Sequence, residues 1–290
     1  MSRGDGRRTR HRRERAGGGR TLVWLLLLVV MVGAVGLALG RDAFRDDPAP
    51  VRADTAPEPV QRLLAREGLR REDVAALLDD ETGIPGGRYL ALTAPGPRGR
   101  SLARAGRPTS LEGFLFPATY EITASTTAQE LVDQQVAAYE SSAALVDYSY
   151  ARARNLTRYD VLILASLVER EVAVPSERRI VAGVMYNRLK ADMRLDIDAT
   201  VQYAIGEWKT ELTATDLRID SPYNTRRFPG LPPGPIASPG LDSIRAAARP
   251  QRNDHLYYVA KNDGSGGHYF SRDAARFEAD VARSRANAGG

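Results

Sequence analysis

Glu169 and Glu171 are the residues of this chain best suited to acid–base chemistry, because both follow the strongly apolar stretch VLIL at 161–164. Drawn as a helix, this segment is apolar on nearly every side, which predicts a buried central helix. A carboxyl group in such surroundings holds its proton more tightly, since desolvation disfavours the charged form. It could therefore act as a general acid, and as a base once the proton is gone.

The spacing of the two glutamates limits the chemistry. At positions i and i+2 of a helix they point roughly 200° apart, so they cannot flank one bond as a pair of glycosidase carboxylates does. If chemistry occurs here, one glutamate performs it and the other has a structural partner. The periodicity does not choose between them, and both could instead be paired with the nearby arginines Arg170, Arg178 and Arg179. One acid suffices where the substrate supplies its own nucleophile.

The elements around these glutamates predict an α+β fold, with a helix-rich domain and a small β-sheet. Thr157 and Asp160 have the spacing of a capping box and open the glutamate helix, which ends before Pro175. The segment 221–240 is too rich in proline and glycine for a regular element. Further helices are expected at 127–140, 142–154, 177–190, 241–249 and 272–286, and a hairpin at 255–261 and 267–271.

The residues before this domain have a different pattern of apolar and loop-forming residues. Apolar residues over 59–81 predict two short helices around Gly68, and the Gly-, Pro- and Arg-rich segment 82–110 predicts a loop. We therefore expect a small region at 59–110, followed by a larger domain at 111–290.

Composition excludes several classes of function. The chain has no cysteine and only three histidines, which excludes thiol catalysis and makes a metal site unexpected. Residues 1–20 carry a net charge of +6, while the other 270 residues carry −1. A nearly neutral folded part lacks the concentrated basic face that nucleic-acid binding requires.

The segment 21–40 contains no charged residue and is long enough to cross a bilayer as a helix. A cleaved signal peptide is the alternative, but its apolar region is usually shorter. The arginine-rich tail 1–20 then lies in the cytoplasm by the positive-inside rule, and a nucleic-acid-binding arm is the lesser interpretation of it. Residues 41–58 form a charged, Pro- and Ala-rich linker to a domain outside the membrane.

Several segments together resemble the endolytic murein transglycosylase family, the YceG-like or MltG proteins. They are LEGFLFPATY (111–120), ASLVERE (165–171), IVAGVMYNRL (180–189), LDIDATVQYAIG (195–206), SPYNTRRFPGLPPGPIASPGLDSIRAA (221–247), HLYYVAK (255–261) and GHYFS (267–271). The chain departs from the family pattern at Ala118, Asp196, Ala199, Arg226 and Ser238. The resemblance covers about 110–290, and the region 59–110 is at most a partial form of the LysM-like subdomain that members carry.

The resemblance implies that Glu169 is catalytic and that Glu171 supports it. It implies cleavage of the β-1,4 bond between N-acetylmuramic acid and N-acetylglucosamine, with the 6-hydroxyl of the muramoyl sugar as the nucleophile and a 1,6-anhydro ring as the product. No metal or other cofactor is expected. The implied partners are peptidoglycan glycan strands, membrane lipid around 21–40, and penicillin-binding synthases of the elongation or division machinery.

Polar and aromatic residues in the same motifs suit a carbohydrate groove, because tyrosine rings stack on sugars and short polar side chains give directional hydrogen bonds. Each has a structural alternative: ring packing, a helix-surface amide, a helix cap, or a rigid loop without ligand contact. His268 is a second conceivable acid or base, although a packed strand histidine is the simpler interpretation. The candidate substrate-binding residues are Tyr120, Tyr186, Asn187, Asp198, Thr200, Ser221, Tyr223, Asn224 and Thr225.

Two rival functions remain open at this stage. The departures from the family pattern fit a peptidoglycan-binding scaffold of the cell-wall machinery with the same fold and no activity. A hydrolase would differ from a transglycosylase only in its nucleophile, water, and would leave reducing ends.

Overall fold

The computed structural model describes residues 59–107 and 109–289, which belong to one compact unit. The predicted tail at 1–20, membrane span at 21–40 and linker at 41–58 lie outside the described residues. Within the described ranges, no helix is long and apolar enough to cross a membrane.

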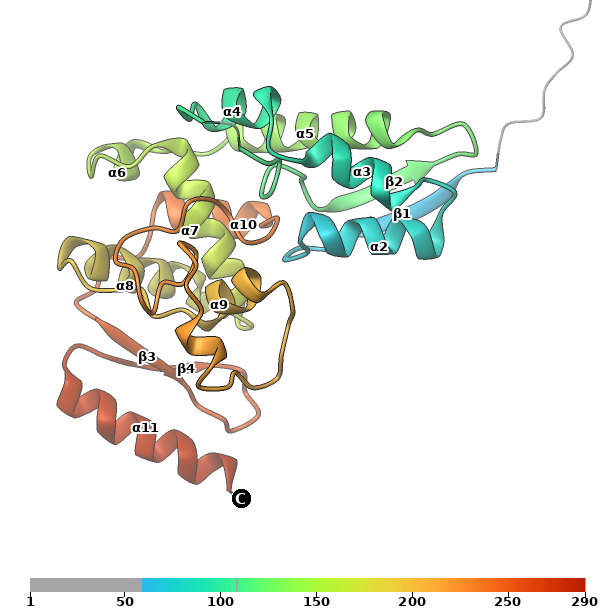
Figure 1. The fold of residues 1–290 in the computed structure, drawn as a ribbon. Coiled ribbons are helices and arrows are strands. Elements are labelled where there is room, and N and C mark those ends of the chain that lie inside the picture. Colours follow the sequence, from blue (N-terminus) through green and yellow to red (C-terminus); the bar gives the residue numbers. More distant parts are fainter. Residues whose placement is uncertain (1–58, 108, 290) are drawn as a thin grey trace, which may run out of the picture. The chain divides into compact units, whose positions relative to one another are not determined.

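The described part is α+β, as predicted, with many helices and two small antiparallel sheets (Figure 1). The elements in chain order are β1 (Gln61–Ala65), α2 (Arg71–Glu81), α3 (Gly86–Thr93), α4 (Pro97–Ala103), β2 (Ala118–Ile122), α5 (Ala128–Ala144), α6 (Ser149–Arg152), α7 (Arg158–Glu171), η1 (Pro175–Glu177), α8 (Arg178–Lys190), α9 (Asp198–Ile205), η2 (Asp216–Arg218), α10 (Leu241–Ala248), β3 (Tyr257–Ala260), β4 (His268–Ser271) and α11 (Ala274–Ala288).

A first, smaller core forms around the sheet of β1 and β2. Leu63 and Ala65 are buried in it while Leu64 between them is exposed, and this alternation is the period of a strand. The predicted helix before Gly68 is therefore wrong, and only α2 after it is helical. Because β2 and α5 contribute to this core, it contains residues on both sides of the expected boundary at 110/111.

The larger core is built on α7, which packs against α8, α9 and α10 (Figure 1). Every residue of 161–168 is buried, which confirms the predicted central helix. The helix begins at the predicted capping box: the Thr157 hydroxyl accepts a hydrogen bond from the Asp160 N–H at 3.1 Å, and the Asp160 carboxylate accepts one from the Thr157 N–H at 2.8 Å. The predicted hairpin is confirmed as β3 and β4, and α11 packs against it.

Other expectations fail where local signals conflict. The loop expected at 82–110 contains α3 and α4, and α4 begins at Pro97, a position where the missing proline N–H costs nothing. The helix expected at 142–154 is reduced to α6, because α5 continues to Ala144. The sequence did not predict α9 or β2.

Candidate active site

Glu169 lies in the last turn of α7, and its side chain is only 7% exposed. Its Oε2 accepts a hydrogen bond of 3.0 Å from the backbone N–H of Gly240, the residue that caps the N-terminus of α10. Its Oε1 lies 3.7 Å from Nη2 of Arg178 at the start of α8. Two helix ends and a cation therefore fix the carboxylate at the surface of the larger core.

A second carboxylate, that of Glu67, lies beside this site. The turn after β1 is joined to the segment before α10 by two backbone hydrogen bonds of 2.9 Å, from Gly68 N–H to Ser238 O and from Ser238 N–H to Leu69 O. This pairing places the Glu67 carboxylate against Cα of Gly240, where any added side-chain atom would collide with it. Both Glu67 and Glu169 therefore meet at Gly240, although they come from different cores.

The charges around Glu67 act on its proton equilibrium. Burial raises the pKa of the Glu67 carboxyl, the negative charge of Glu169 raises it further, and Arg178 opposes the rise. Asp242, in the first turn of α10, adds to it. The like charges at this site therefore make ionisation of Glu67 less favourable.

An open cavity of about 510 Å³ contains both carboxylates. Ala118 lines it, so one departure from the family pattern lies directly at this site. The remaining walls come from the two strands of the small sheet and their flanking turns. The residues lining the cavity are Leu64, Ala65, Arg66, Glu67, Pro117, Ala118, Thr119 and Glu169.

Glu171 lies in a different environment. Its Oε2 accepts a hydrogen bond of 2.9 Å from the hydroxyl of Tyr258 on β3, so it faces the hairpin rather than the cavity. Burial raises the pKa of Glu171, and the nearby charge of Asp198 adds to that effect. The hydroxyl of Tyr258, and not an arginine, is its hydrogen-bond partner, whereas Glu169 does have the arginine neighbour that the alternative interpretation expected.

His268 contacts the carboxylate of Glu177. Its Nδ1 lies 2.7 Å from Oε2 of Glu177, and its backbone N–H donates to the same carboxylate at 3.0 Å. Its side chain is 9% exposed. The packed strand histidine is the interpretation that this arrangement fits.

Ser166, one turn before Glu169, attaches the Pro- and Gly-rich segment to α7. Its hydroxyl accepts a hydrogen bond of 3.1 Å from the N–H of Ile236 and donates one of 2.7 Å to the carbonyl of Ile163. All three residues are buried. The segment 221–240 is thus a fixed wall beside α7, and it leads directly to the Gly240 N–H that binds Glu169.

Three of the candidate binding residues form one buried cluster. The hydroxyls of Thr200 and Thr225 lie 2.9 Å apart, and Thr225 also accepts a hydrogen bond from the N–H of Ile197. The amide of Asn224 donates to the carbonyls of Leu217 and Ile219. These side chains fix the 221–225 segment onto α9 and η2.

Tyr120, Tyr186 and Asn187 likewise hold elements together. The two tyrosine rings are each 6% exposed, and their hydroxyls donate to the carbonyls of Phe116 and Ala247. The amide of Asn187 donates to the segment that leads into β3. The rings therefore pack in the cores, as the packing alternative proposed.

The last three candidates lie nearer the surface. Asp198 is the first residue of α9 rather than its cap, and its carboxylate pairs with the Arg226 guanidinium at 2.6 Å. The ring of Tyr223 lies 4.8 Å from that of Tyr203, and its N–H donates to the hydroxyl of Ser221. None of the nine candidate binding residues lines the cavity that contains Glu169. Their contact with glycan stays a prediction.

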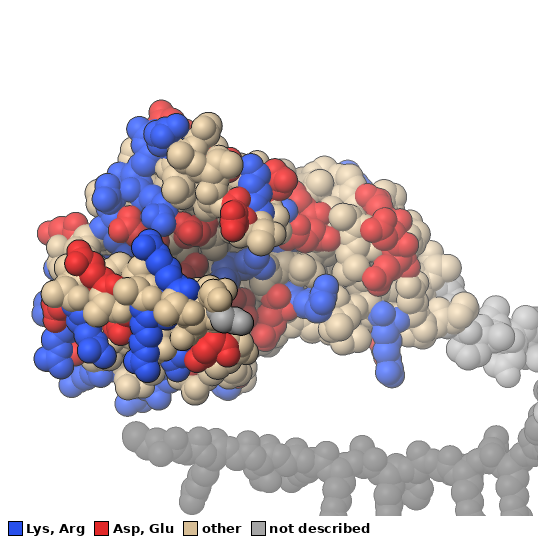
Figure 2. Space-filling view, turned by 90° about the horizontal axis from the view of Figure 1, so that it is seen from below, with Lys and Arg blue, Asp and Glu red and all other residues tan. Residues whose placement is uncertain are grey.

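Sequence reasoning missed Glu67 and Gly240 at this site, whereas Arg178 is among the arginines that it placed near the two glutamates. Glu67 was missed because it lies in a turn that precedes the segments resembling the family. Charged side chains of both signs are interspersed on the face of the molecule shown in Figure 2. A cavity lined by two carboxylates and approached by an arginine can bind a polar, uncharged ligand and move one proton on it.

Glu169 thus lies at the end of a buried helix and lines an open cavity. The chain belongs to the YceG-like family, whose model matches residues 51–283. This confirms the resemblance that the motifs predict.

Three relatives place the chain within the family. A protein of Streptococcus pneumoniae (strain ATCC BAA-255 / R6) named endolytic murein transglycosylase is 41% identical over 202 residues, covering 67% of this chain and 36% of the relative. A protein of the same name from Bacillus subtilis (strain 168) is 38% identical over 194 residues, covering 67% of this chain and 53% of that protein. The crystal structure of a yceG-like protein from Listeria monocytogenes matches with a TM-score of 0.66 and 31% identity over 75% of each chain.

Proposed function

We propose that this protein is a membrane-anchored lytic transglycosylase that cuts peptidoglycan glycan strands internally. The bond is the β-1,4 link between N-acetylmuramic acid and N-acetylglucosamine, and the product is a strand ending in 1,6-anhydro-N-acetylmuramic acid. The observation that carries the proposal is the position of Glu169, buried at the end of the central helix and open to a cavity, in a chain whose relatives are named endolytic murein transglycosylase.

One glutamate performs both proton transfers. The protonated Glu169 gives its proton to the glycosidic oxygen, the bond from that oxygen to C1 of the muramoyl sugar breaks, and N-acetylglucosamine leaves with a free 4-hydroxyl. The Glu169 carboxylate then takes the proton from the 6-hydroxyl as O6 bonds to C1. Glu169 thus regains the proton that it gave, and no water is consumed. The transition state resembles an oxocarbenium ion.

The neighbours of Glu169 suit the second half of this cycle. The Gly240 N–H and Arg178 stabilise the carboxylate that forms when the proton has gone. Glu171, held by Tyr258, supports α7 from its other side.

The proposed anchor is the segment 21–40, with 1–20 in the cytoplasm and the catalytic part outside. The topology follows from charge: arginines before the span and a nearly neutral chain after it. Outside the membrane, the enzyme would meet nascent strands where penicillin-binding synthases make them. The alternative, a scaffold without activity, is favoured only by the departures from the family pattern, of which Ala118 lines the cavity.

The topology is testable because the chain has no cysteine of its own. A single cysteine at Ala279, an exposed position on α11, is expected to react with a membrane-impermeant maleimide in intact bacterial cells or spheroplasts. A cysteine at Ser2, in the arginine tail, is expected to react only after the membrane is opened. Labelling of Ser2→Cys before Ala279→Cys would reverse the proposed orientation.

Replacing Glu169 with glutamine removes a like charge beside Glu67. The pKa of the Glu67 carboxyl is therefore expected to fall, because the negative charge of Glu169 is one of the causes that raise it. Titration of the Glu67 carboxyl by NMR in the wild type and the variant measures the change. Glu121→Gln, an equal charge change at an exposed position on β2, is the control. A Glu67 pKa that rises, or that falls equally in both variants, would contradict this coupling.

A further inference from the structure

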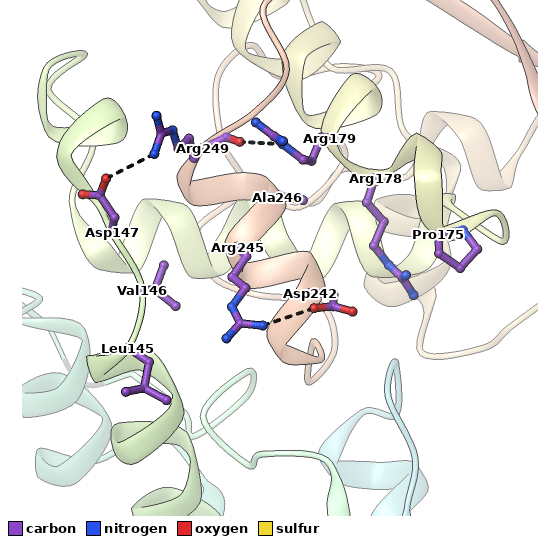
Figure 3. Close-up of a pocket in the computed structure, with 10 residues that line it drawn as sticks. All are labelled: Leu145, Val146, Asp147, Pro175, Arg178, Arg179, Asp242, Arg245, Ala246 and Arg249. Atoms are coloured by element: carbon purple, nitrogen blue, oxygen red, sulfur yellow. Dashed lines mark hydrogen bonds and ion pairs between the residues drawn. The ribbon is translucent and has the colours of Figure 1, made fainter.

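A second hollow lies on the other side of Arg178. It is a groove of about 670 Å³ between α10, the start of α8 and the loop after α5 (Figure 3). We call it the arginine groove, after Arg178, Arg179, Arg245 and Arg249. Its remaining lining residues are Leu145, Val146, Asp147, Pro175, Asp242 and Ala246. Four arginines against two aspartates give the groove a positive balance in a folded part that is otherwise nearly neutral.

The arginines are not satisfied by their own ion pairs. Nη1 of Arg245 lies 3.6 Å from Asp242, and Nη1 of Arg249 lies 3.9 Å from Asp147, as the dashed lines in Figure 3 show. These two arginine side chains are 53% and 70% exposed. Long, single, exposed contacts contribute little, so both guanidinium groups keep the paired N–H donors that bind a carboxylate in two places at once.

Arg178 and Arg179 form the inner end of the groove. The Nε of Arg179 donates to the carbonyl of Arg249 at 3.1 Å, which fixes this arginine against the end of α10. The Nε of Arg178 is buried and has no acceptor among the described residues, while Nη2 reaches Glu169 at a long 3.7 Å. A buried donor without an acceptor is costly, and it points to a ligand or water that completes the site.

The groove adjoins the catalytic carboxylate, because Arg178 lines the one and contacts the other. The sugar whose C1 is attacked at Glu169 carries its lactyl group, and the peptide attached to it, on the same ring at C3. That peptide contains free carboxylates along its length and at its end. It therefore leaves the ring next to an arginine-lined groove that is large enough for several of its residues.

We propose that the arginine groove binds the carboxylates of the peptide carried by the muramoyl sugar at the cleavage site, an inference that rests on the proposed transglycosylase function. Arg245 and Arg249 would engage the carboxylates farther along the peptide, and Arg178 would position the lactyl end beside Glu169. The enzyme would then select peptide-bearing strands over strands whose peptides have been removed.

The test compares two substrates on the full chain. The double variant Arg245→Gln/Arg249→Gln is expected to lower kcat/KM about tenfold on peptide-bearing glycan strands, mainly through KM, and to leave cleavage of amidase-stripped strands unchanged. The matched control Arg88→Gln/Arg285→Gln removes the same charge from exposed positions on α3 and α11 and is expected to change neither. Equal losses on both substrates, or no loss on the peptide-bearing one, would overturn the proposal.

A binding measurement separates this inference from the proposed activity. Isothermal titration of the full chain with a soluble muramyl pentapeptide is expected to show binding that weakens about tenfold in the double variant and with the carboxyl-amidated peptide. This readout needs no catalysis, so a chain that binds the peptide through the groove but cuts no strand would refute the transglycosylase alone. Binding that is the same in wild type and variant would refute the groove.

Discussion

Replacing Glu169 with glutamine is expected to reduce the rate of strand cleavage by about 10²- to 10⁴-fold, the contribution typical of a positioned general acid and base. Glutamine keeps the size of the side chain and an oxygen that can accept the Gly240 N–H. It cannot give a proton to the leaving oxygen. The loss should therefore appear in kcat, with strand binding and thermal unfolding close to those of the wild type, when initial rates are measured by release of soluble fragments from purified strands.

The matched variant is Glu171→Gln, the same chemical change two residues away on the same helix. Its amide oxygen can still accept the hydrogen bond from Tyr258, so we expect a loss of less than about tenfold. The comparison also decides between the two glutamates, which the helical pattern leaves open. A wild-type rate in Glu169→Gln with a collapse in Glu171→Gln would transfer the catalytic role to the residue that faces the hairpin.

Glu112 is expected to make the stability of the protein fall as pH rises. It is 1% exposed, its Oε1 has no hydrogen-bond partner among the described residues, and its Oε2 accepts a long bond of 3.4 Å from the Arg71 N–H. Burial raises the pKa of Glu112 to about 8, and the nearby charge of Glu72 adds to that. The folded protein therefore keeps a proton there that the unfolded chain releases near its ordinary pKa of 4.5.

The direction in which stability changes with pH follows from the coupling between proton binding and folding. The stability that the protonated carboxyl contributes is complete below about pH 4.5 and is lost as pH rises towards 8. Over that window the free energy of unfolding should fall by about 3 kcal/mol, less than the full pKa difference would give because buried sites relax. Glu112→Gln, which is neutral at every pH, should flatten the slope. Urea unfolding at pH 5, 6.5 and 8 measures it, and parallel slopes for the two proteins would contradict the assignment.

Glu112 lies in the segment that connects the two hydrophobic cores. Leu111 belongs to the first core and Phe114 to the larger one, so the segment joins the two cores. Gly113 between them has φ of 81° and packs against Pro235, where a side chain would collide.

The parts of the fold that the sequence predicted well are those with local causes. The Thr157–Asp160 box and the apolar run after it define α7 without reference to the rest of the chain. The DGSGG turn between two β-prone runs defines the hairpin. By contrast, the strand β1 was missed because its partner β2 begins more than fifty residues later, and QRLLA alone reads equally as a helix.

The candidate site likewise combines residues with local sequence signals and residues placed by contacts between distant segments. The apolar helix points to Glu169 and Glu171 together, and only the family resemblance favours Glu169. Glu67 is not recognisable from the sequence, because only the backbone pairing of Gly68 and Leu69 with Ser238 brings it to Gly240. Thr200 and Thr225, two of the motif residues proposed as sugar contacts, hydrogen-bond to one another. The sequence does not tell these roles apart, since a side chain that fixes a loop and one that binds a ligand have the same chemistry.

The most direct test of the proposed function is the identity of the new chain ends. The full chain, in detergent, is incubated with purified peptidoglycan strands, and the fragments are identified by mass spectrometry beside a Glu169→Gln control. Fragments ending in 1,6-anhydro-N-acetylmuramic acid, present with the wild type and absent from the control, are the predicted result. Reducing ends would show that water is the nucleophile and the protein a hydrolase, and strand binding without any fragment would contradict catalysis altogether.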